Sequence, residues 1–85
     1  MNENELREAV LTSLGEVAPE IDPAALDPSM PVADQVEIDS MDFLDFVVAL
    51  AGRTGIEVPE RDYADLASVD DCVLYLAARV PAQAP

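Results

Sequence analysis

Four prolines in one segment constrain the fold of this chain more than any other feature. They stand at Pro19, Pro23, Pro28 and Pro31. Each removes a backbone donor and disfavours a continuing helix, so we predict a long, turn-rich connection over residues 19–39, with room for one helical turn near residues 32–35. So long a loop in a small protein needs anchoring, and its apolar side chains should pack across the core. They are Ile21, Leu26, Met30, Val32, Val36 and Ile38.

Apolar side chains before this loop recur at helical spacing. The intervals are four, four and three residues, at Leu6, Val10, Leu14 and Val17. This periodicity predicts a first helix from about residue 3 to residue 18. Either Asn2 or Asn4 is suited to cap its start, and the proline at position 19 cannot continue it.

A second helix should begin directly after Asp39 and run from Ser40 to about Arg53. Asp39 has the side chain of an N-cap, and Asp42 occupies the far position of a capping box. Gly55 is the candidate left-handed residue that closes the helix. One face of this helix is predicted to enter the core, through Phe43, Phe46, Val47 and Leu50.

Two further helices are predicted in the last third of the chain. A short helix over residues 60–65 follows Pro59, with Tyr63 and Leu66 available for burial. Ser68 then opens a last helix over residues 69–80, in a second capping-box arrangement with the acid three residues later. The apolar stripe of this last helix comprises Val69, Cys72, Val73, Leu76, Ala77 and Val80.

These elements predict an all-α fold. Three longer helices and one short helix, without any alternating strand pattern, should pack as a small four-helix bundle with a long first loop. We expect residues 1–80 to form a single domain and residues 81–85, which are alanine, proline and glutamine, to form a disordered tail.

Composition excludes most functions other than protein binding. Eighteen acids face four arginines, with no lysine and no histidine, for a net charge of −14. That charge repels nucleic acid and anionic membranes and favours basic protein surfaces. The usual general base, Schiff-base amine and soft metal ligands are missing, and Cys72 has no partner cysteine. We therefore expect a monomeric cytoplasmic protein that is not an enzyme, holds no metal and does not insert into membranes.

The start of the second helix is the candidate functional site. Ser40 falls at the first helical position, where the positive helix end favours an attached phosphate. Asp42 and Asp45 lie on the side of the helix away from the core, with Met41 and Val48 at the margin. This side is either a docking surface for a basic, partly apolar partner or simply the solvated side of a core helix.

Residues 39–41, Asp-Ser-Met, resemble the Asp-Ser-Leu/Met attachment motif of acyl carrier proteins. The resemblance extends to residues 55–59, Gly-Ile-Glu-Val-Pro, and to residues 68–71, Ser-Val-Asp-Asp, and it covers the chain from Leu6 to about Val80. It implies that a phosphopantetheinyl transferase places 4′-phosphopantetheine from coenzyme A on Ser40. The thiol of that arm would carry acyl groups as thioesters, and the acidic helix would dock on basic patches of fatty acid, polyketide or related biosynthetic enzymes.

Some positions depart from the family. Glu37 stands where many relatives have glycine, and residues 51–53, Ala-Gly-Arg, stand where fatty acid carriers often continue the acidic strip, so a specialised pathway is a strong alternative. Phe43 and Phe46 would fill part of the space in which the family shelters acyl chains, which predicts poor shelter for long saturated chains. In the competing interpretation, both rings are ordinary core.

Three functions remain open at this point. A chain that begins at Met1 without a fused catalytic domain favours a free-standing acyl carrier. An aminoacyl or peptidyl carrier of the same fold often has glycine or histidine just before the serine, whereas this chain has Glu-Ile-Asp at residues 37–39. The third alternative is an acidic helical adaptor in which Ser40 belongs only to the cap.

Overall fold

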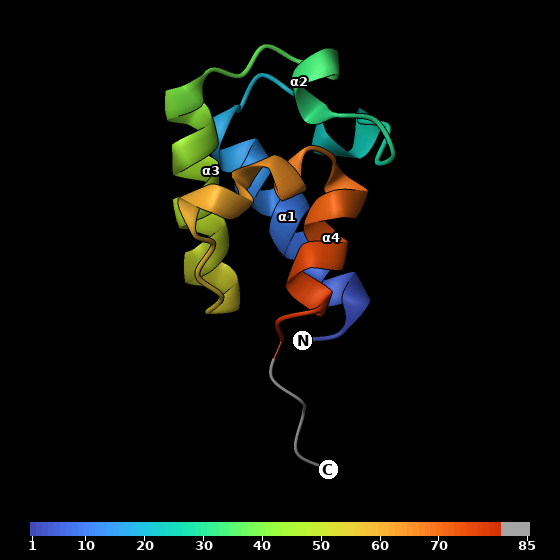
Figure 1. Cartoon of the computed structure of the whole chain (residues 1–85). Coiled ribbons are helices and arrows are strands. Elements are labelled where there is room, and N and C mark those ends of the chain that lie inside the picture. Colours follow the sequence, from blue (N-terminus) through green and yellow to red (C-terminus); the bar gives the residue numbers. More distant parts are fainter. Residues whose placement is uncertain (81–85) are drawn as a thin grey trace.

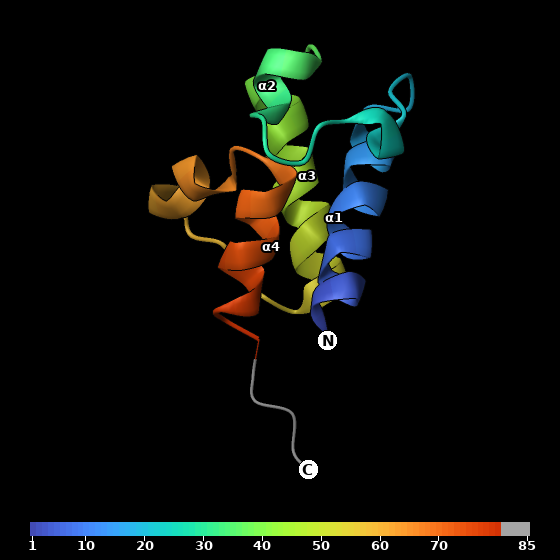
Figure 2. The ribbon, with the colours of Figure 1, turned by 90° about the vertical axis from the view of Figure 1, so that its right-hand side faces the viewer.

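The computed structural model describes residues 1–80, and the predicted tail at residues 81–85 lies outside them. Three long helices lie side by side in both views of the chain (Figures 1 and 2): α1 (Glu3–Val17), α3 (Ser40–Thr54) and α4 (Val69–Ala77). Shorter helical pieces connect them: η1 (Pro23–Ala25), α2 (Val32–Gln35) and η2 (Glu60–Leu66). Within the described part there is no strand, so the predicted all-α bundle with a long first loop is confirmed.

The start of α1 is fixed by its own side chains. Asn2 Oδ1 accepts a hydrogen bond from the Glu5 amide at 2.8 Å, and Glu5 Oε1 accepts one from the Asn2 amide at 2.9 Å. This reciprocal capping box selects Asn2, rather than Asn4, as the N-cap. The helix ends at Val17, next to the predicted boundary.

The core forms where α1 packs against both α3 and α4. Leu6, Val10 and Leu14 of α1 are almost fully buried there, and burial of each such side chain is worth about 1.5–3 kcal/mol. From α3, the predicted core residues Phe46, Val47 and Leu50 are buried. Phe43 is only half-buried, at the edge of the core.

The last helix differs from its prediction in length and in one face. It ends at Ala77 instead of residue 80, and the Arg79 amide then donates to the Leu76 carbonyl at 3.0 Å in a tightened final turn. Residue 81 is proline, which disfavours helix in the residue before it. Ala77, predicted to face the core, is exposed, whereas Tyr75 is buried. Ser68 caps the helix as predicted, its Oγ accepting from the amide of residue 71 at 3.0 Å. Within the described residues the return bond from the Ser68 amide to the Asp71 carboxylate is missing, so the predicted capping box is only half formed.

Two backbone hydrogen bonds anchor the long loop to the region just before and inside α4. The Val32 amide donates to the Ala67 carbonyl at 2.8 Å, and the Asp70 amide donates to the Pro28 carbonyl at 2.9 Å. Val32 is buried, as the anchoring hypothesis requires, but Met30 is exposed because the turn that contains it faces solvent. The predicted helical turn over residues 32–35 is present as α2.

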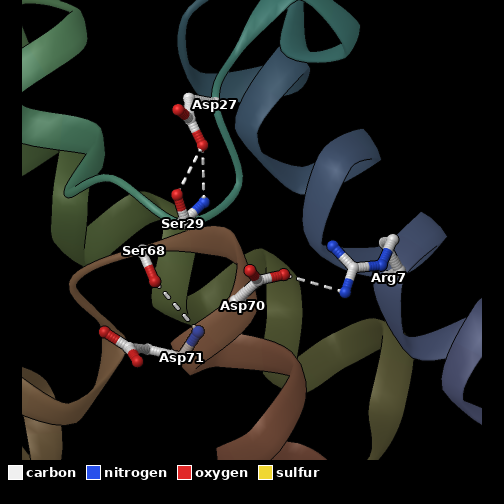
Figure 3. A network of polar contacts seen from close by, with 6 residues as sticks. All are labelled: Arg7, Asp27, Ser29, Ser68, Asp70 and Asp71. Atoms are coloured by element: carbon white, nitrogen blue, oxygen red, sulfur yellow. Dashed lines mark hydrogen bonds and ion pairs between the residues drawn. The ribbon is translucent and has the colours of Figure 1, made fainter.

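Polar side-chain contacts lie on both sides of this crossing of the loop and α4. Figure 3 shows Asp27 accepting from both the amide and the hydroxyl of Ser29, next to the segment that contains Ser68. In the same view, Arg7 of α1 reaches Asp70 at 2.9 Å. The contact joins the first helix to the last, and a partly exposed ion pair of this kind contributes about 0–1 kcal/mol.

Two glycines, one inside α3 and one at its end, allow the assigned C-terminal end of this helix to be tested. Gly55 closes the helix with a φ of 72°, as predicted, whereas Gly52 lies inside the helix with open space around the position of a Cβ. Gly55→Ala should therefore lower the free energy of unfolding by about 1–2 kcal/mol, because alanine is strained in the left-handed region. Gly52→Ala should raise it by about 0.5–1 kcal/mol, because alanine favours helix.

Urea unfolding of both variants measures these changes. Equal shifts of the same sign for the two variants would contradict the assigned ends of α3.

Candidate attachment site at the start of α3

The cap of α3 presents Ser40 to solvent. Asp39 has extended backbone angles, and its Oδ1 accepts from the Asp42 amide at 2.8 Å. The Asp42 carboxylate completes the predicted capping box with a longer contact of 3.5 Å to the Asp39 amide. Ser40 is the first residue of the helix and is exposed, at the end of the bundle where the loop from α2 arrives (Figure 1).

This position suits a phosphate ester. The hydroxyl of Ser40 takes part in no hydrogen bond among residues 1–80, so its oxygen is available to an enzyme. A 15-residue helix begins here, and its positive end favours a phosphate oxygen. The neighbouring carboxylates of Asp39 and Asp42 oppose that charge, but each already accepts a backbone hydrogen bond. The residues present therefore fit a phosphate-linked group on an exposed alcohol.

An apolar ridge, formed by Met41, Leu44 and Val48, runs along α3 from this site. Their side chains are exposed by 73%, 46% and 71%. Spacings of three and four residues place them on one face of the helix. The predicted docking surface included Met41 and Val48 but not Leu44, which the same helical spacing could have identified. Asp45 is exposed beside the ridge, as predicted.

Asp42 differs from the other three predicted docking residues. It is half-buried, and both its amide and its carboxylate take part in the capping box. The main role of Asp42 in this structure is therefore to cap the start of α3. Glu37 lies in the loop just before Ser40. It is exposed and lines a shallow hollow together with Asp39 and Asp42.

A partly open apolar cavity of about 140 Å³ lies next to the first turns of α3. It is lined by residues of α1, α3, η2, α4 and the loop. Phe43 and Phe46 both line it, with their ring centroids 6.1 Å apart. Phe43 also meets the ring of Tyr63 edge-on at 5.4 Å. The two rings therefore belong to a cavity wall as well as to the core.

Cys72 lines the same cavity from α4. Burial, with a smaller contribution from the adjacent Asp71 carboxylate, raises the pKa of its thiol to about 12. The protonated thiol contacts the Leu66 carbonyl at 3.6 Å. Because the thiolate is the nucleophilic form, Cys72 remains unreactive at neutral pH.

No helix within residues 1–80 combines the length and apolar character needed to cross a bilayer.

Comparison with known proteins identifies a matching family and several similar proteins. Residues 4–76 match the family described as the phosphopantetheine attachment site. The chain is 29% identical over 73 residues to the meromycolate extension acyl carrier protein of Mycolicibacterium smegmatis, covering 82% of this chain and 74% of that protein. It is 27% identical to the protein of the same description from Mycobacterium tuberculosis, of which it spans 64%.

A third relative is similar over most of both chains. The acyl carrier protein of Acidothermus cellulolyticus is 30% identical over 74 residues, which cover 84% of this chain and 88% of that protein. The prosthetic group of this family is 4′-phosphopantetheine. On the extent of the family match and the agreement of its relatives, this chain belongs to the acyl carrier proteins of the phosphopantetheine attachment family.

Proposed function

We propose that this chain carries acyl groups as thioesters on a 4′-phosphopantetheine arm attached to Ser40 Oγ. The observation that carries the proposal is the exposed hydroxyl in the first turn of α3, held there by the capping box within the segment that matches the family. The arm supplies a terminal thiol, which forms the thioester. The protein supplies an exposed anchor and a surface for partner enzymes, and it performs no chemistry of its own.

Ser40 is the acceptor in the loading reaction. A phosphopantetheinyl transferase removes the hydroxyl proton, Oγ forms a bond to the phosphorus that carries the pantetheine of coenzyme A, and adenosine 3′,5′-bisphosphate leaves. The Asp39 and Asp42 cap holds the first turn in place, so that the acceptor oxygen keeps one orientation. No group on the carrier has to act as a base, and the chain has no histidine or lysine.

The docking surface combines the apolar ridge with Asp45. Exposed apolar side chains of this size supply contact area, and the carboxylates steer a basic partner. Because residues 51–53 add no acid, the partner surface should have basic groups near the start of α3 and an apolar groove along Leu44 and Val48. Transferases and acyl-modifying enzymes with such patches are the proposed partners.

The cavity is the proposed shelter for the acyl chain. Its 140 Å³ is close to the ~150 Å³ of an engineered apolar cavity that binds benzene, a ligand of about six carbon atoms. A short acyl chain fits without rearrangement, whereas a long chain needs a wider space. Two relatives are described as carriers in meromycolate extension, so carriage of a growing fatty chain is the pathway class that we propose.

Ser40→Ala tests the attachment directly. Incubation of the wild type with coenzyme A and a transferase of broad specificity should add one pantetheine-sized mass, and the variant should show none, since alanine has no acceptor oxygen. Intact-protein mass spectrometry measures the addition.

Ser29→Ala, which removes another exposed serine, is the matched control and should be loaded normally. An unmodified wild type would instead favour the acidic adaptor, and a loaded Ser40→Ala would assign the arm to another residue.

Charge reversal tests the docking surface. Asp45→Arg should lower kcat/KM of loading about 10-fold at low salt and much less at high salt, because it removes steering of a basic partner. Leu44→Ser should lower it at both salt concentrations, because it removes apolar contact. Initial rates across a salt series measure both effects.

Two controls make the same chemical changes elsewhere. Glu8→Arg reverses an exposed acid on α1, and Leu74→Ser changes a leucine that is 70% exposed on α4. Equal losses in the controls and in the α3 variants would leave the α3 face without a specific role.

Phe43→Ala tests the size of the shelter. Removal of the ring should slow hydroxylamine cleavage of a dodecanoyl thioester several-fold, because the enlarged cavity accepts more of the chain, while a butanoyl thioester should be cleaved as in the wild type. Equal cleavage of the dodecanoyl thioester in both proteins would show that the ring does not limit shelter.

A further inference from the structure

The wall of the cavity formed by η2 is weakly held by its own backbone. η2 is a seven-residue 3-10 helix without a side-chain cap, and such helices are rarely stable beyond three or four residues. It packs against α4, and Leu66 is its one buried residue. Tyr63, Ala64 and Leu66 all line the cavity. The position of η2 therefore sets the width of the cavity.

A polar cluster of Asp62, Tyr75 and Arg79 ties η2 to α4. The Tyr75 hydroxyl donates to Asp62 Oδ2 at 2.7 Å, and the Arg79 Nη2 lies 3.8 Å from the same oxygen. The Arg79 guanidinium also covers the Tyr75 ring, 3.5 Å from its centroid, and donates to the Tyr75 carbonyl at 3.1 Å. The three residues come from η2, from α4 and from the turn after α4.

The cluster is partly shielded from water, which strengthens its interactions. Tyr75 is only 6% exposed, and the Asp62 side chain is 21% exposed. Loss of solvation and the bond to Asp62 raise the pKa of the Tyr75 hydroxyl, so the donor keeps its proton at neutral pH. A hydrogen bond to a carboxylate in such a place is stronger than one between neutral groups at the surface.

We infer that Asp62, Tyr75 and Arg79 form a latch that determines the length of acyl chain the cavity accepts. With the latch closed, η2 stays on α4 and the cavity keeps its size. When the Tyr75 to Asp62 bond opens, the hydrogen bond that remains within residues 1–80 between a side chain of α4 and η2 is the long contact of 3.6 Å from the Cys72 thiol to the Leu66 carbonyl. The apolar residues of η2 can then move apart from α3. The inference rests on the proposed function for its acyl chain, but the latch itself is a property of the unmodified protein.

A second tie to α4 allows a latch to be distinguished from general stabilisation. Arg7 and Asp70 join α1 to α4 at 2.9 Å, and neither residue lines the cavity. Loss of that pair should weaken the bundle without a preferential effect on η2. Loss of the latch should instead increase local opening of η2 more than opening of the other helices.

Hydrogen exchange of the unmodified chain tests the latch without any acyl group. Tyr75→Phe keeps the ring under Arg79 and removes only the hydroxyl. It should speed exchange of the amides in residues 60–67 about 10-fold, with the buried amides of α1 unchanged. Arg7→Gln, the control, should not speed exchange in η2 more than in α1. Unchanged exchange in η2, or an equal increase in every helix, would overturn the latch.

Thioester protection tests its consequence. In the loaded protein, Tyr75→Phe should slow hydroxylamine cleavage of a dodecanoyl thioester several-fold relative to a butanoyl thioester. An unchanged ratio, in a variant whose η2 exchanges faster, would overturn the link between latch and chain length. If the wild type cannot be loaded at all, the proposed function fails, while the exchange experiment still decides whether the latch exists.

Discussion

The structure depends on the burial of α1 between α3 and α4. α1 packs against both neighbours, and its side chains Leu6, Val10 and Leu14 are almost fully buried. Burial of such apolar side chains is the main favourable contribution to so small a fold. Because one face of α3 is committed to α1, its opposite face must remain in solvent. The exposed ridge and the position of Ser40 at the free end of α3 follow from that packing.

The second constraint is charge. A net charge of −14 on 85 residues repels itself, and three of the four arginines lie where they join separate elements. Arg7 links α1 to α4, Arg53 of α3 contacts Glu16 of α1 at 2.6 Å, and Arg79 reaches η2. Because these three arginines pair with residues of other elements, none of them lies at the start of α3, where the charged side chains are all acidic. The positions of the arginines therefore limit repulsion between the helices and leave the start of α3 negative, which favours basic partners.

Local chemistry made much of this fold predictable. The Asp39 cap, the left-handed Gly55 and the boundaries of α3 follow from interactions between residues close in sequence. Contacts between distant residues were not predictable. Tyr75 is buried with its hydroxyl on Asp62, 13 residues away in the chain, whereas Ala77 is exposed. The cavity likewise exists only after α3, η2 and α4 have packed together. The sequence therefore suggested the phenyl rings that line the cavity, but neither its volume nor the part that η2 plays in its wall.

We propose that the start of α3 presents an alcohol to which an arm is attached without disturbance of the bundle. The most direct measurement compares amide NMR spectra of the protein before and after treatment with coenzyme A and a transferase. Attachment at Ser40 should cause large shifts for Ser40 and its immediate neighbours, with the buried amides of α1 nearly unchanged. Loading that moves the α1 amides as much as those at the start of α3, or that leaves the Ser40 signal in place, would contradict it.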